Sequence, residues 1–188
     1  MDTTRETFLD VGTFILMILS ALAVDLILHR SGHLELGRYL GYVGTGLLVL
    51  SFLYSARKRK WIKSGRAPFF LRFHETLSWL GAMLILVHGG IHFNALLPWL
   101  AMASMLVAVA SGLTGKYLLK KSKGIIKGKE ETLLKQGLTK EELKDHLYWD
   151  ALVVDVMKRW RVVHIPITIT FALLTLLHVA TVLIFWRW

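Results

Sequence analysis

The sequence predicts an all-α integral membrane protein with five transmembrane helices, folded as a single membrane domain over residues 1–188. Two observations predict this fold class. Hydrophobic residues make up 54% of the chain, which is more than a soluble domain of this length usually carries. These residues are also concentrated in runs of about 20, the helix length needed to cross about 30 Å of hydrocarbon.

The five predicted spans are separated by short polar turns or by basic segments. The N-terminal stretch "MDTTRETFLDVG" lacks the basic region and small-residue cleavage site of a signal peptide, so we expect the first span to be retained. In chain order, the predicted spans cover about residues 9–28, 36–55, 70–93, 97–119 and 160–186.

The basic residues predict the orientation of these spans. Of the 23 Lys and Arg residues, 18 fall in segments 56–66 and 116–161, both between hydrophobic runs. Basic loops stay on the cytoplasmic side, so the net charge of +10 reports topology in a lipid bilayer and no nucleic-acid partner. We expect an inner (cytoplasmic) membrane location, a cytoplasmic N-terminus and an outside C-terminus ending in the interface anchor "FWRW".

A long cytoplasmic loop is predicted over residues 120–159. Three glycines, Gly124, Gly128 and Gly137, interrupt its Lys-rich first half. Thr139 followed by Glu142 forms a capping box, which predicts a short helix in this loop. This helix either rests on lipid headgroups or docks a cytoplasmic partner.

Two pairs of histidines with identical spacing lie in the predicted spans. His74 and His88 bound the segment "HETLSWLGAMLILVH", and His164 and His178 bound "HIPITITFALLTLLH". Fourteen residues correspond to about 21 Å along a helix and return to within about 40° of the same face. Ionisable residues inside a membrane are rare and usually face the bundle interior, where they meet a partner or a ligand.

The third and fifth spans are predicted to run in the same direction, which pairs these histidines at two depths. His74 then meets His164 near the cytoplasmic side, and His88 meets His178 near the opposite side. Two facing imidazoles fill both axial positions of a haem iron and give a low-spin centre suited to electron transfer. The pattern therefore predicts two bis-histidine haems b, with these four histidines as iron ligands.

Four further residues are assigned to the cofactor sites, three of them with an alternative. Gly81 lies midway between His74 and His88, where a missing side chain leaves room for a macrocycle or allows close helix packing. Arg72 and Arg161 flank the cytoplasmic pair and either bind haem propionates or anchor the helices at the interface. Phe171, midway along the fifth span, is expected between the haems.

The remaining histidines have weaker claims to a ligand role. His92 lies one turn beyond His88 and is the alternative outer ligand, although His88 reproduces the spacing of the other helix. His29 and His33 fall at or beyond the end of the first span, where interfacial exposure is expected. His146 is expected on the surface of the cytoplasmic loop helix.

Two carboxylates near the predicted ligands have both a functional and a structural interpretation. Glu75 adjoins the cytoplasmic pair and either relays protons to quinone or faces the headgroups and pairs with Arg72 or Lys63. Asp25, near the outer end of the first span, has the same two interpretations, with Arg30 as its expected ionic partner.

The segments "HETLSWLGAMLILVH" and "RWRVVHIPITITFALLTLLHV" make the chain resemble the di-haem cytochrome b membrane subunits of respiratory formate dehydrogenases and hydrogenases. The chain is more distantly similar to ferric-reductase-like four-helix cores. The resemblance implies that spans two to five form a four-helix haem-binding bundle. It also implies transmembrane electron transfer as a subunit of a respiratory oxidoreductase complex, with peripheral or extracytoplasmic redox proteins as partners and quinone as a candidate one.

Other functions remain open from the residues alone. The chain has no cysteine and no nucleotide-binding fingerprint, so iron–sulfur clusters are excluded and an enzymatic activity of its own is undetermined. A histidine-based metal-ion transporter would cluster its ligands at one depth and usually add carboxylates. A haem-free anchor or assembly subunit would use histidines as interhelical hydrogen-bond donors, which requires no matched spacing.

Overall fold

The computed structural model describes residues 3–91, 95–136, 148 and 160–185, and all regular structure in them is helical. Five helices are long and apolar enough to cross a membrane, which confirms the predicted fold class. The helices are α1 (Thr3–Ser31), α2 (Leu36–Ser51), α3 (Leu53–Lys58), α4 (Ala67–Ile91), α5 (Leu96–Lys135) and α7 (Arg161–Phe185).

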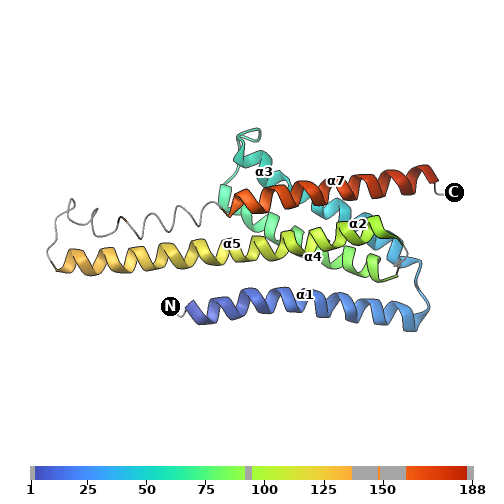
Figure 1. Ribbon diagram of the computed structural model, residues 1–188, viewed down its shortest axis with the longest axis horizontal. Helices are drawn as coiled ribbons and strands as arrows, with labels where there is room; N and C mark the ends of the chain where they lie inside the picture. The colour runs from blue at the N-terminus through green and yellow to red at the C-terminus, as the bar shows by residue number, and fades with distance from the viewer. Residues whose placement is uncertain (1–2, 92–94, 137–147, 149–159, 186–188) are drawn as a thin grey trace.

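The helices run up and down along one axis (Figure 1). α1, α4 and α7 point in one direction, whereas α2 and α5 return in the other, so the third and fifth spans are parallel as predicted. We call the end that carries the basic segment 59–66 the loop side, and the end that carries the α1–α2 turn (32–35) the turn side.

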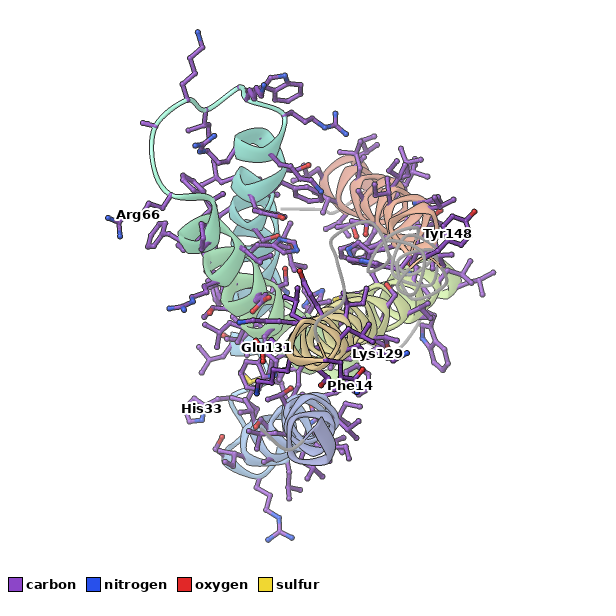
Figure 2. All side chains as sticks on the ribbon, turned by 90° about the vertical axis from the view of Figure 1, so that its left-hand side faces the viewer. Phe14, His33, Arg66, Lys129, Glu131 and Tyr148 are labelled. Carbon is purple, nitrogen blue, oxygen red and sulfur yellow. The ribbon has the colours of Figure 1, made fainter. Side chains whose placement is uncertain are left out.

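Two antiparallel helix pairs form the bundle. α2 packs along α4, α5 packs along α7, and the two pairs meet where α4 contacts α5. α1 lies outside this arrangement, against α4 and α5, which is visible in the end-on view of Figure 2. α4 and α7 share no extensive backbone contact among the described helices, and the rings of His88 and His178 face one another between them.

The central core lies between the two ends of the bundle. Its buried members come from every spanning helix and are Met17, Leu48, Ala82, Met105 and Phe171. Many large apolar side chains instead cover the outer surface, among them Leu22, Val49, Leu100 and Leu176. An apolar exterior of this extent fits contact with lipid rather than with water.

α5 differs from the prediction at its loop-side end. We expected Gly124 and Gly128 to lie in the loop that follows residue 119. Both instead lie inside α5, which continues to Lys135. A glycine inside a helix costs only about 1 kcal/mol relative to alanine, too little to end a helix whose neighbours favour it. The predicted helix that begins near Thr139 falls outside the described residues.

The second span also differs from a single straight helix. It is interrupted at Phe52, between α2 and α3. The residue before the interruption, Ser51, has its carbonyl oxygen 3.0 Å from Nδ1 of His74 on α4. The break therefore coincides with a side chain that bonds to a helix carbonyl, which is a known cause of helix kinks.

Candidate functional site

α2 and α4 pack in a seven-residue register that involves both histidines of α4. Ser51 lies opposite His74 and Gly37 lies opposite His88, as shown by the hydrogen bonds of the two imidazoles. Midway between them, Gly44 lies opposite Gly81, with each glycine's Cβ direction 3.0 Å from the other's carbonyl oxygen. Seven residues are two helical turns, so the whole stripe of α4 faces α2.

The hydrogen bonds to α2 determine which nitrogen of each α4 imidazole is available. Nδ1 of His74 lies 3.0 Å from the Ser51 carbonyl, and Nδ1 of His88 lies 2.9 Å from the Gly37 carbonyl. A carbonyl oxygen only accepts, so both Nδ1 atoms carry the proton and donate it. Nε2 of each ring then keeps the lone pair through which an imidazole binds a metal.

His164 is held in the same way by α5, the partner of its own helix. Its Nδ1 lies 2.7 Å from the hydroxyl oxygen of Ser111. The neighbouring Gly112 lies beside the ring, and a Cβ atom on it would make an ordinary van der Waals contact, 3.5 Å from Cε1 of His164. Ser111 therefore orients His164 from α5, as the Ser51 and Gly37 carbonyls orient His74 and His88 from α2.

His178 occupies a different environment at the turn side. It lines an open groove of about 310 Å³ between the start of α5 and the end of α7, together with Pro98, Thr181 and Phe185. It makes no hydrogen bond through its ring to another described residue; the hydroxyl of Thr181 donates to its main-chain carbonyl. Thr175, one turn earlier, has a buried hydroxyl oxygen without a partner among the described residues.

The histidines of α4 and α7 lie at two depths of the bundle. At the turn side, the ring centres of His88 and His178 lie 6.4 Å apart, with the ring planes tilted by 51°. At the loop side, His74 lies on α4 and His164 on α7, each fourteen residues from its turn-side counterpart. We call these the turn-side pair and the loop-side pair.

The distance within the turn-side pair suits a bis-histidine metal. Two imidazoles that bind one metal ion from opposite sides have ring centres about 6 Å apart, since each metal–nitrogen bond is about 2.0 Å. The ring centres of His88 and His178 lie 6.4 Å apart. The donor set therefore fits a bis-histidine haem: two neutral imidazoles from different helices, at least one with Nε2 left unprotonated.

Aromatic side chains flank the loop-side pair on both helix pairs. Tyr54 on α3 stacks on His74 with ring centres 5.6 Å apart. Trp160 contacts His164 with ring centres 4.8 Å apart, and it packs directly over Gly115 of α5. The indole nitrogen of Trp160 is buried without a hydrogen-bond partner among the described residues.

The other predicted cofactor residues have different placements. Gly81 faces α2, where a Cβ atom would lie 2.8 Å from Cγ of Leu48, so it serves close helix packing, the alternative stated for it. Arg72 is exposed and lies about 200° around the helix from His74, a position that suits interfacial anchoring. The side chain of Arg161 and the whole of His92 lie outside the described residues.

The two carboxylates singled out in the sequence lie close to histidines. Glu75 is half-buried and interacts electrostatically with the adjacent His74. Asp25 has His29 as its ionic neighbour, at 3.4 Å, rather than the expected Arg30. Nδ1 of His29 also bonds to the Asp25 carbonyl, and its side chain is 47% exposed, which agrees with an interfacial position.

Sequence reasoning missed the residues on α2 and α5 that orient the imidazoles. The signal on α2 is present in the sequence, since Gly37, Gly44 and Ser51 share the seven-residue spacing of His74, Gly81 and His88. On α5, Ser111 and Gly112 stand singly and give no comparable pattern.

Groups of three or more metal-ligating side chains do not occur among the described residues. Two histidines are enough to hold a haem iron, so a haem requires no such group. Scans against protein-family models, curated proteins and solved structures gave no match to this chain. The resemblance to di-haem cytochromes b therefore rests on the histidine spacing and remains a prediction.

Proposed function

We propose that the chain is a membrane cytochrome b that binds two haems between α4 and α7 and transfers electrons across the membrane. His74 and His164 would hold the iron of the loop-side haem, and His88 and His178 that of the turn-side haem. The observation that carries this proposal is the 6.4 Å separation of the ring centres of His88 and His178, which come from α4 and α7. When bound, each haem would supply an iron that exchanges single electrons between its ferrous and ferric states.

The chain's own residues would perform three tasks. The Nδ1 bonds of His74, His88 and His164 fix the tautomer and direction of each imidazole, which strengthens Nε2 as a ligand. The buried core around Phe171 and Met105 fills the middle of the bundle between the two layers and excludes water. The apolar outer surface keeps both layers within the hydrocarbon region.

The layer spacing supports transfer across much of the bilayer. Fourteen residues separate the two ligands on each helix, which corresponds to about 21 Å along the membrane normal. We propose that the loop side faces the cytoplasm, because the basic segments follow the positive-inside pattern. The redox partners are then a protein on one side and a protein or quinone on the other.

Haem counting tests the proposal directly. The purified chain, expressed where other cytochromes b are loaded, is expected to bind two haems per chain in a pyridine haemochrome assay. His74→Ala or His164→Ala should each remove one haem, and His88→Ala or His178→Ala should each remove the other. His33→Ala, at an exposed turn position, serves as the control and should retain both.

The possible outcomes separate the proposal from its rivals. A haem-free wild-type protein would refute electron transfer by this chain and leave metal transport or anchoring as the function. Loss of both haems in every one of the four variants would mean that the layers are not independent sites. One haem in the wild type, lost only in His88→Ala and His178→Ala, would restrict the proposal to the turn-side pair.

A further inference from the structure

The ligand orientation at His164 depends on a side chain, unlike that at His74 and His88. Oγ of Ser111 lies 2.7 Å from Nδ1 of His164 and donates its own proton to the Ala108 carbonyl, at 2.9 Å. Since a hydroxyl has a single proton, Ser111 accepts the Nδ1 proton of His164. A polar chain thus runs from the imidazole through Ser111 to the main chain of α5.

Ser111 is the position at which a side-chain substitution can change the hydrogen bonding of a proposed haem ligand. The Nδ1 partners of His74 and His88 are main-chain carbonyls, which a side-chain substitution does not remove. The ring of His178 has no hydrogen bond to another described residue. Among the described contacts, the hydroxyl of Ser111 is therefore the one side-chain acceptor of an Nδ1 proton, and it joins His164 to the Ala108 carbonyl, which also lies near the ring.

A hydrogen bond accepted from Nδ1 makes the opposite nitrogen a stronger electron donor to a bound metal. A stronger donor stabilises the ferric state over the ferrous state and so lowers the reduction potential. We propose that Ser111 is a positioning residue that lowers the reduction potential of the loop-side haem through His164. This inference rests on the proposed function, because it requires a haem bound at that pair.

Ser104 provides a matched control on the same helix. It stands two turns before Ser111, its hydroxyl bonds to the Leu100 and Ala101 carbonyls, and none of its hydrogen bonds among the described residues goes to a histidine. Ser104→Ala therefore removes a comparable serine hydroxyl from α5 and leaves His164 untouched. Ser111→Thr keeps a hydroxyl at the site and should keep the hydrogen bond.

The test is an equilibrium redox titration of the purified, haem-loaded full chain, followed at the absorbance of the reduced haem. A second titration in a His178→Ala background, which retains the loop-side haem alone, assigns the potential. For Ser111→Ala we expect about a tenfold higher ratio of reduced to oxidised loop-side haem at a fixed ambient potential, an upward shift of about 59 mV. Ser111→Thr and Ser104→Ala should titrate as the wild type does, and all variants should bind two haems.

Each alternative result overturns a stated part of the argument. Two haems with an unshifted loop-side potential in Ser111→Ala would overturn the inference and leave the proposed function intact. An equal shift in Ser104→Ala would show a general packing effect and overturn it as well. A haem-free wild-type protein would refute the proposed function first, before any Ser111 variant is compared.

Discussion

Gly41 of α2 lies directly against the imidazole of His88. A Cβ atom on Gly41 would be 2.8 Å from both Cγ and Nδ1 of that ring. The same ring donates from Nδ1 to the Gly37 carbonyl, one helical turn away on α2. α2 thus fixes the turn-side imidazole through the Gly37 carbonyl, and the missing side chain of Gly41 leaves the space that the ring occupies.

Gly41→Ala is therefore expected to displace the His88 ring and weaken the turn-side site. A contact of 2.8 Å to a ring that is fixed by a hydrogen bond forces the ring or the helix to shift. We expect loss of one haem per chain in a pyridine haemochrome assay, with the loop-side haem retained. The double variant Gly41→Ala/His178→Ala should lose no second haem, because both substitutions affect the turn-side layer.

Gly46→Ala is the matched control for this substitution. Gly46 lies on the same helix, is exposed, and has no atom within 4 Å of its Cβ direction. The control variant should keep two haems and be at least as stable as the wild type, because alanine favours a helix by up to about 1 kcal/mol. Two haems in Gly41→Ala would contradict the placement of His88.

Gly44→Ala should separate α2 from α4 at the midpoint of their contact. A Cβ atom there would lie 3.0 Å from the Gly81 carbonyl and 3.1 Å from side-chain atoms of Leu84 and Ile85. Overpacking of this kind typically costs about 1–3 kcal/mol. We expect a lower midpoint of thermal unfolding in detergent than for Gly46→Ala, and an unchanged midpoint would refute the close approach of the helices.

The fold class was predictable because membrane-spanning helices can be recognised in a sequence by their length and hydropathy. A bilayer requires about 20 apolar residues per span, so each run is visible without knowledge of its neighbours. The interruption at Phe52 was not predictable, because it coincides with a bond between Ser51 and His74 on another helix. The length of α5 beyond Gly124 was misjudged because a glycine is a weak helix breaker.

The candidate site was predictable only in part. Equal spacing on two parallel helices was enough to bring His88 to His178, whereas the contact between His74 and His164 stays a prediction. The assignment of Gly81 to the cofactor did not foresee that the histidine stripe of α4 also faces α2. Helical periodicity predicts which residues share one face of a helix. It does not predict which neighbouring helix packs against that face.

Gly115→Ala should disturb the loop-side pair through Trp160. The indole ring of Trp160 packs directly over Gly115, so an added methyl group must displace it. Because Trp160 also contacts His164, with ring centres 4.8 Å apart, we expect a changed absorbance spectrum or loss of the loop-side haem. Gly124→Ala, further along the same helix with open space around it, should leave both haems unchanged.

Trp79→Phe should loosen α1 from the bundle without affecting either histidine pair. The indole nitrogen of Trp79 on α4 donates to the Thr13 carbonyl on α1, at 2.9 Å. The phenylalanine keeps an aromatic ring there but removes the donor, which should cost about 0.5–1.5 kcal/mol of stability. We expect a lower thermal midpoint in detergent with two haems retained. Trp61→Phe, at a site 74% exposed in the basic segment, should have no such effect, and an equal loss there would show that the Thr13 bond does not stabilise the bundle.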